Sequence, residues 1–138
     1  MTELRRDDMD IHDGIKQFYE ALNALIAGDI EPMKEVWLHD DYVTYLDPTG
    51  AYLVGWDKVL ESWQKQADMH IGGDVHTEKL QVMVEGNMAV AHNYEIGNTE
   101  IEGKREHVFI RATNVFLKKD GKWKMISHHV DHMKMLEG

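Results

Sequence analysis

Arg111, His129 and Asp131 are the residues of this sequence whose types and spacing could together do acid–base chemistry. An imidazole beside a carboxylate can take up or release a proton near neutral pH, and an arginine can hold a carboxylate or an enolate oxygen. Asp131 follows His129 by two residues, so their side chains share one face if this segment is a strand. An ion-pair network in a solvated cavity would use the same residue types. Both interpretations are open.

Residues 104–132, which contain these three side chains, are predicted to form two long strands joined by a tight turn. A three-residue loop at 119–121 would use its glycine in the left-handed conformation. A two-residue Asp-Gly loop would instead place Ala112 opposite His129. We prefer the longer loop, because it pairs apolar with apolar residues near the turn and polar with polar residues further out. It predicts the pairs Leu117–Trp123, Val115–Met125, Thr113–Ser127 and Arg111–His129. The face that carries them changes from apolar to polar along its length, as the wall of a pocket would.

The elements that must position these residues follow from the hydrophobic periodicity. Apolar residues recurring every three or four positions predict helices at 10–27, just after Asp29 and after Gly55. Alternation and turn residues predict strands at 42–46, 77–85 and 88–96, and residues 97–103 form a polar connection. Helices followed by a run of antiparallel strands predict an α+β fold, with the helices on one face of a curved sheet.

Composition limits the classes of function. The 138 residues make one domain, 1–138, with 43% hydrophobic and 29% charged residues, which is ordinary for a globular chain. There is no cysteine, so disulfide and thiolate chemistry are excluded. A formal net charge of −10 argues against sequence-independent nucleic-acid binding. Neither an apolar signal segment nor a run of about 18 apolar residues is present, so a cytoplasmic location without a membrane partner is the default expectation.

Several short segments match a known protein family. They are Ala21-Leu22-Asn23, Ala27-Gly28-Asp29, Asp41-Tyr42-Val43, Asp47-Pro48-Thr49-Gly50, Gly86-Asn87-Met88-Ala89 and Asp120-Gly121-Lys122-Trp123. On these residues the chain resembles the nuclear transport factor 2-like superfamily, in its SnoaL-like and ketosteroid-isomerase-like branch. The resemblance implies a cystatin-like cone, in which three N-terminal helices pack in a curved, mostly antiparallel sheet around a deep pocket. It also implies a homodimer formed through the sheet.

Asp47 opens an Asp-Pro-x-Gly turn that carries the general base in the ketosteroid isomerases. A carboxylate beside an apolar cavity gains basicity from desolvation, although an aspartate before proline also simply initiates turns. The rest of the isomerase pattern is missing, because the family's oxyanion tyrosine falls on Ala21 and its protonated aspartic acid falls near Thr113. Tyr19 lies about 200° around the helix from Ala21, so we do not expect it to substitute.

Aromatic and polar residues supply the remaining pocket candidates. Aromatic residues at helical spacing are more often core than ligand site, but Trp63 has the best claim because the third helix flanks the cone's mouth in this family. His92 and Tyr94 alternate with Asn93 and Glu95, so one of the two pairs faces inward. The predicted ligand-binding set is Phe18, Leu22, Tyr45, Trp63, His92, Tyr94 and Thr113.

The nine histidines do not predict a metal site. His128 and His132, the outer two of the C-terminal group, would lie about 13 Å apart along a strand and could not share an ion.

The predicted function is that of a small-molecule pocket protein, of the SnoaL-like kind. As an enzyme it would transfer protons on a carbonyl compound without a cofactor, as an isomerase, cyclase or dehydratase. Asp47 or His129 would be the base, Arg111 would stabilise negative charge, and Asp131 would assist His129. The alternative is a non-catalytic ligand-binding or dimeric assembly domain. The expected ligand is a small apolar or carboxylate-bearing molecule.

Overall fold

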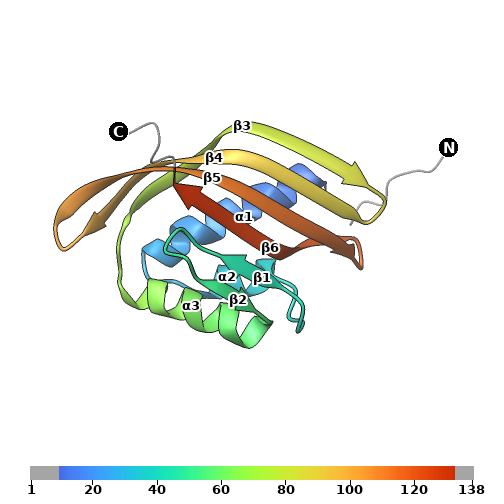
Figure 1. Cartoon of the computed structure of the whole chain (residues 1–138), viewed down its shortest axis with the longest axis horizontal. Helices are drawn as coiled ribbons and strands as arrows, with labels where there is room; N and C mark the ends of the chain where they lie inside the picture. The colour runs from blue at the N-terminus through green and yellow to red at the C-terminus, as the bar shows by residue number, and fades with distance from the viewer. Residues whose placement is uncertain (1–9, 133–138) are drawn as a thin grey trace.

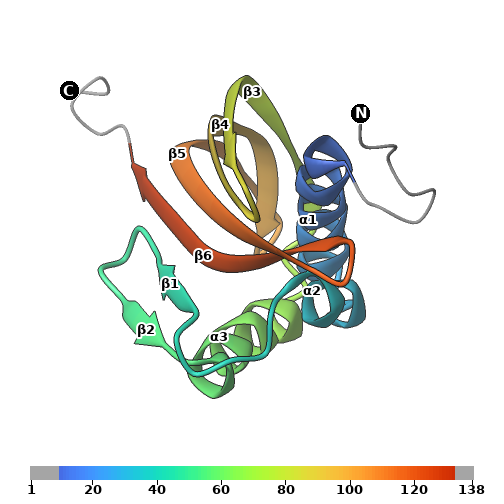
Figure 2. The ribbon, with the colours of Figure 1, turned by 90° about the vertical axis from the view of Figure 1, so that its right-hand side faces the viewer.

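The computed structural model describes residues 10–132, which fold as three helices and one six-stranded sheet. The elements are α1 (Ile11–Ile26), α2 (Glu31–Val36), β1 (Thr44–Leu46), β2 (Tyr52–Val54), α3 (Trp56–Asp68), β3 (Gly73–Glu85), β4 (Met88–Ile101), β5 (Lys104–Lys119) and β6 (Lys122–His132). The strand order is β2-β1-β6-β5-β4-β3, and all neighbours are antiparallel except β1 and β6. Figures 1 and 2 show the sheet curving around the helices, which confirms the predicted α+β class. Within the described range, no helix has the length and apolar character needed to cross a membrane.

Helix α1 packs along the concave side of the sheet and carries most of the helical core. Asp10 caps its first turn by accepting a hydrogen bond from the His12 backbone N–H. Phe18 and Leu25 are fully buried, and α1 contacts β3, β4 and β6 as well as the other helices. Because the sheet wraps around it, the helix buries a wide arc that includes both Tyr19 and Ala21.

The β5–β6 turn differs from the predicted three-residue loop. The loop has two residues, Asp120 and Gly121, both with positive φ (52° and 77°), as a type I′ turn requires. Lys118 therefore pairs with Trp123. The preferred register was wrong because an Asp-Gly pair in a type I′ turn matches the twist of the flanking strands, which outweighs the apolar pairing we had favoured.

A β-bulge at Ile126 changes the register again along the same hairpin. Phe116 pairs with Met125 but Val115 pairs with Ser127, so β6 carries one extra residue. Beyond the bulge Arg111 pairs with Asp131, rather than with His129 as predicted. The bulge lies between two parallel contacts of β6, the Trp37–Met125 bridge and the start of the β1 pairing at Ser127. An extra residue here flips every later side chain of β6 to the other face.

Two further strand boundaries differ from the predictions. The polar segment 97–103 is not a connection, because β4 continues to Ile101 and pairs with β5 up to Lys104. Figure 1 shows this hairpin end extending past the helices at the left, where both faces meet solvent and polar residues are no obstacle to a strand. The short strand β2 was not predicted.

Candidate functional site

The hydroxyl group of Tyr19 is the centre of a buried polar network between α1 and the sheet. It donates to Glu95 Oε2 at 2.7 Å and accepts from Asn93 Nδ2 at 2.9 Å and Asn114 Nδ2 at 3.0 Å. Asn114 Oδ1 in turn lies 2.5 Å from His128 Nδ1. Apart from tyrosines and tryptophans, the only buried polar or charged residues within residues 10–132 are Asn93, Glu95, Asn114 and His128.

Three neighbouring strands bring the network together. Asn93 and Glu95 alternate along β4 and both face inward. Asn114 on β5 pairs with His128 on β6, which faces inward because of the bulge. His128 Nε2 lies 3.8 Å from Glu95 Oε2, too far for a hydrogen bond but close enough for the two groups to act on one small ligand.

Burial sets the protonation of the two ionisable groups. Glu95 is 3% exposed, and this desolvation raises the pKa of its carboxyl from 4.5 to about 7, against the opposing hydrogen bond from Tyr19. His128 is 2% exposed, and burial lowers the pKa of its imidazole from 6.5 to about 3, with a smaller contribution from the nearby His129. Near neutral pH the site therefore holds a neutral imidazole next to a carboxyl group that is poised to gain or lose a proton.

Aromatic rings enclose the imidazole of His128. Phe18, Tyr45 and Trp63 have ring centroids 4.9, 5.3 and 5.9 Å from it. Three buried polar atoms of the described residues lack a protein partner. They are Trp63 Nε1 in this group, Trp37 Nε1 on the ring packed against Trp63, and Asn93 Oδ1 on the amide that bonds Tyr19. Buried polar groups are normally satisfied, so an unpartnered donor and an unpartnered acceptor here point to a ligand or solvent partner.

A surface hollow reaches the network from outside, between α1 and β3. It has a volume of about 310 Å³, and Tyr19 is among its lining residues. The other lining residues are His12, Ile15, Lys16, Glu20, Asn23, Val75, His76, Thr77 and Leu80. Thr77 is the β3 residue paired with Glu95, although Glu95 itself is not among the lining residues.

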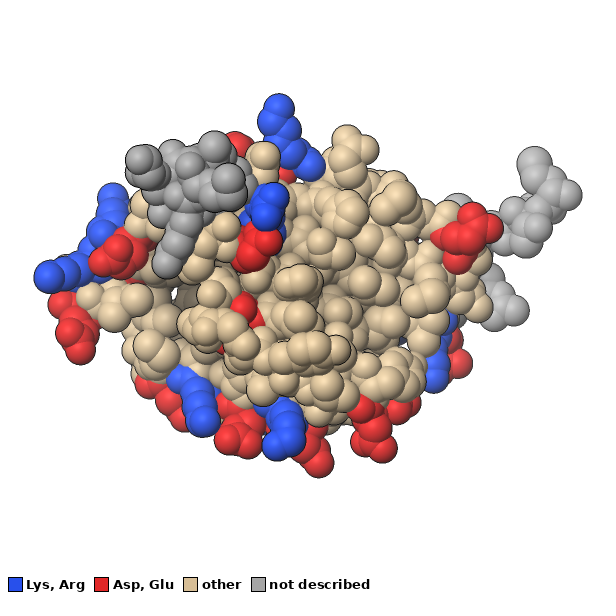
Figure 3. Space-filling view, in the orientation of Figure 1, with Lys and Arg blue, Asp and Glu red and all other residues tan. Residues whose placement is uncertain are grey.

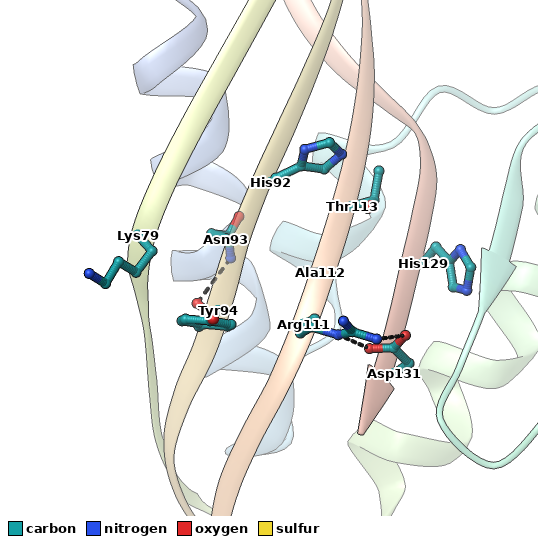
Figure 4. A pocket seen from close by; sticks show the side chains of 9 residues that line it. All are labelled: Lys79, His92, Asn93, Tyr94, Arg111, Ala112, Thr113, His129 and Asp131. Carbon is teal, nitrogen blue, oxygen red and sulfur yellow. Dashed lines mark hydrogen bonds and ion pairs between the residues drawn. The ribbon is translucent and has the colours of Figure 1, made fainter. Parts of the chain in front are cut away.

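A second hollow, of about 360 Å³, lies on the outer face of the sheet. It is shown in Figure 4 and is lined by Lys79, His92, Asn93, Tyr94, Arg111, Ala112, Thr113, His129 and Asp131. Arg111 Nε and Nη2 each donate to Asp131 at 2.9 Å, and both side chains are half exposed. This pairing lowers the pKa of the Asp131 carboxyl and raises that of Arg111. Such an exposed pair contributes little to stability.

Asp47 is engaged within its own turn. Its Oδ1 accepts from the Thr49 N–H at 2.9 Å, the Thr49 hydroxyl at 2.6 Å and the Ala51 N–H at 3.1 Å. These contacts hold together the tight connection between β1 and β2, which is the turn-forming role an aspartate before proline commonly has.

The comparisons with known proteins agree with this fold. A family model described as a SnoaL-like domain matches residues 11–132, which is most of the chain. The protein belongs to the SnoaL-like family. This SnoaL-like domain is 26% identical to the F-box protein SKIP8 of Arabidopsis thaliana in an alignment 139 positions long, which covers 91% of this chain but only 57% of that protein.

Two solved structures share the fold of this SnoaL-like domain. A candidate dehydratase of the NTF2-like family from Streptomyces avermitilis superposes with a TM-score of 0.78 at 24% identity, covering 88% of this chain and 92% of the other. A candidate calcium/calmodulin-dependent protein kinase type II association domain from Thiobacillus denitrificans has a TM-score of 0.75 at 22% identity, with 88% and 94% coverage. Together with the match to the SnoaL-like family model, this confirms the superfamily expected from the sequence.

The structure divides the predicted site residues of this SnoaL-like domain between three places. Phe18, Leu22, Tyr45 and Trp63 are buried inside the cone. Asp47 lies in the β1–β2 turn. The outer-face hollow brings together the other six: His92, Tyr94, Arg111, Thr113, His129 and Asp131.

The interior polar groups are those that sequence reasoning did not select. Tyr19 was considered only as a substitute for the family's oxyanion tyrosine, and its place in a buried network was not predicted; the sheet wraps around α1 and buries the tyrosine there. Asn93 and Glu95 form the inward pair of the two alternatives left open on β4. Asn114 was missed because the predicted three-residue loop favoured the other face of β5 as the pocket wall, whereas with the two-residue turn Asn114 faces inward on the same face as Phe116. His128 was missed because the bulge reverses the alternation of β6.

Proposed function

We propose that this SnoaL-like domain is a cofactor-independent enzyme that transfers protons on a neutral carbonyl compound, with Glu95 as its acid–base group. The observation that carries the proposal is the buried Glu95 carboxyl, whose pKa of about 7 suits a group that must both take and return a proton near neutral pH. A base of this kind can remove a proton next to a carbonyl and deliver it elsewhere on the same molecule, as in isomerisation or dehydration.

Removing a proton next to a carbonyl needs a donor for the oxygen that becomes an enolate. Trp63 Nε1 is a buried donor without a protein acceptor in the aromatic group that also encloses His128. It is the group we assign to this task. Tyr19 is less suitable, because its single hydrogen is already donated to Glu95.

The charge of the interior favours a neutral ligand over a carboxylate. No lysine or arginine is buried anywhere in residues 10–132, and Glu95 would repel an anion whenever it is ionised. Of the two expected kinds of ligand, apolar or carboxylate-bearing, we therefore favour the uncharged, mainly apolar kind. Figure 3 shows lysine and arginine interleaved with aspartate and glutamate along the rim where α3 lies, so this face presents no basic stripe for nucleic acid.

Proton transfer can be measured without knowing the natural substrate. A panel of neutral cyclic ketones and enones would be incubated in heavy water, and exchange of the hydrogens next to the carbonyl followed by NMR. We expect the wild-type protein to accelerate exchange for some panel members and Glu95→Gln to abolish the effect. Asp131→Asn and Asp47→Asn, which alter the outer hollow and the β1–β2 turn, should leave it intact. Exchange that survives Glu95→Gln but is lost in either of the other variants would assign the chemistry to those residues instead.

A second proposal concerns assembly, and rests on the outer face of the sheet. Met83 and Met88 are 55% and 46% exposed on this face, and Val90, Val115 and Leu117 beside them are only partly covered. Contiguous exposed apolar residues commonly mark an interaction site. We propose that two copies of the chain pair through this face, which would enclose the outer hollow between them.

A further inference from the structure

His128 has no part in the proton transfer assigned to Glu95, although it is buried beside that carboxyl. Its Nδ1 contacts Asn114, and its Nε2 faces Glu95. The ring cannot tilt far, because the rings of Phe18, Tyr45 and Trp63 surround it. The positions of the hydrogens in the network determine whether Nε2 is a hydrogen-bond donor or an acceptor.

The hydrogen bonds of Tyr19 fix the orientation of Asn114. A phenol has one hydrogen, and that of Tyr19 goes to Glu95 Oε2. Tyr19 then accepts from the amide nitrogens of Asn93 and Asn114, and Asn93 Nδ2 is held in that orientation by a second bond, to the Tyr94 carbonyl. With its nitrogen committed to Tyr19, Asn114 presents its carbonyl oxygen to His128.

A carbonyl oxygen can only accept, so the hydrogen of the neutral imidazole must be on Nδ1. Nε2 is then an unprotonated acceptor. It faces Glu95 Oε2 across 3.8 Å, and that oxygen already accepts from Tyr19. Two acceptors face each other, and the distance exceeds that of a direct hydrogen bond.

A single oxygen atom about 2.8 Å from each of these atoms would bridge them, since two bonds of that length can join atoms 3.8 Å apart. A hydroxyl group meets both demands, because its hydrogen can be donated to Nε2 while its oxygen accepts from Glu95 when the carboxyl is protonated. A carbonyl oxygen would leave Nε2 without a donor.

We propose that Asn114 holds His128 as the Nδ1–H tautomer, and that His128 Nε2 selects a carbonyl compound that also carries a hydroxyl group. Asn114 is the positioning residue and His128 the specificity-determining one. The ligand class rests on the proposed function of the site, whereas the tautomer rests on the hydrogen-bond network alone.

The tautomer is tested by side-chain ¹⁵N–¹H correlation NMR of the uniformly ¹⁵N-labelled full chain at pH 7, with His128→Gln used to assign the signals. We expect Nδ1 to carry the hydrogen and Nε2 to show the shift of an unprotonated nitrogen. Asn114→Leu should move the hydrogen to Nε2, whereas Asn114→Asp, which keeps an acceptor oxygen, should leave it on Nδ1. A hydrogen on Nε2 in the wild-type protein, as the reversed network would give, overturns the proposal even if Asn114→Leu does not fold.

Ligand selection is tested by NMR titration of cyclohexanone against its 2-, 3- and 4-hydroxy derivatives. At least one hydroxylated compound should bind roughly tenfold more tightly than cyclohexanone, as expected for one well-made hydrogen bond in a buried site. The preference should disappear in Asn114→Leu. Equal binding of all four compounds overturns the selection. Absence of hydrogen exchange in the ketone panel would instead refute the catalytic proposal and leave the tautomer result standing.

Discussion

The hydroxyl group of Tyr19 makes three hydrogen bonds to three buried side chains, and so holds the interior network in one arrangement. Each partner is shielded from water, so none can find a substitute when the hydroxyl is removed. This single atom therefore connects a helix to two central strands.

Tyr19→Phe should destabilise the protein by about 2–3 kcal/mol, because it leaves two amide N–H groups and a carboxyl without their partner. The measurement is the free energy of unfolding from urea denaturation. Tyr52→Phe is the matched control, since Tyr52 is 69% exposed on β2 and its substitution should change stability by less than about 0.5 kcal/mol. Equal effects of the two substitutions would show that the network contributes nothing to stability.

Glu95 should make the protein less stable as the pH rises. Its pKa is about 7 in the folded state and 4.5 ordinarily, so the folded state binds its proton more tightly and stability falls between pH 4.5 and pH 7. The full loss corresponds to roughly 3 kcal/mol. His128 acts in the opposite direction between pH 3 and pH 6.5, because its pKa is lowered in the folded state. The two effects oppose each other from pH 4.5 to 6.5, and above that range only the loss from Glu95 continues.

Glu95→Gln isolates this contribution, because glutamine keeps an acceptor for Tyr19 but cannot ionise. Relative to wild type, the variant should gain stability progressively from pH 5 to pH 8, as measured by urea unfolding at each pH. Glu106→Gln, on the exposed part of β5, should follow wild type at every pH. A constant difference between Glu95→Gln and wild type would mean that Glu95 has the same pKa in the folded and unfolded states.

At the scale of elements, the sequence predicts where helices and strands lie better than it predicts which faces they present. Residues 10–27 and the segment after Gly55 were predicted as helices, and α1 and α3 confirm them. The hairpin of β5 and β6 was also predicted. The face on which each of its side chains lies was not, because a two-residue turn and a bulge each changed the register. Hydrophobic periodicity reports an element's type, whereas the bulge lies where β6 also meets distant segments such as Trp37, and local periodicity carries no signal of it.

Glycine at position 97 is required by the close approach of β3 to β4. A Cβ on Gly97 would overlap the carbonyl oxygen of Asp74. Gly97→Ala should therefore cost about 2–3 kcal/mol in urea unfolding. Gly86→Ala, in the open β3–β4 turn, meets no atom and should cost only about 1 kcal/mol, from its positive φ of 59°. Equal costs of the two substitutions would show that β3 can move away from Gly97 without loss of stability.

At the scale of the whole molecule, the architecture followed from the order of the elements, but the interior did not. The cone could be anticipated because helices precede a run of strands and because several short segments of the chain match the family. The buried network could not, because its five polar residues come from four elements and their inward orientation depends on sheet curvature and on strand register. Neither the sheet curvature nor the strand register can be read from the local alternation of apolar and polar residues.

The pairing of two chains through the outer face predicts a specific response to charge. Wild-type protein should have the mass of a dimer in light scattering after size exclusion, and Met83→Glu with Met88→Glu should convert it to a monomer of unchanged thermal stability. Tyr52→Glu, which places one negative charge on the opposite edge of the sheet, should remain dimeric. A wild-type protein that is monomeric at tens of micromolar would refute the pairing.

The extra residue at Ile126 decides which of two consecutive histidines is enclosed. With the bulge, His128 faces the interior and His129 faces outward; without it, the order of inside and outside would be exchanged. A deletion of one residue at this point would thus replace one buried imidazole by another while leaving both in the sequence. Relatives that share the His-His pair but differ in strand length here would keep the residues and exchange their roles. An alignment scored on identity alone would not detect the change.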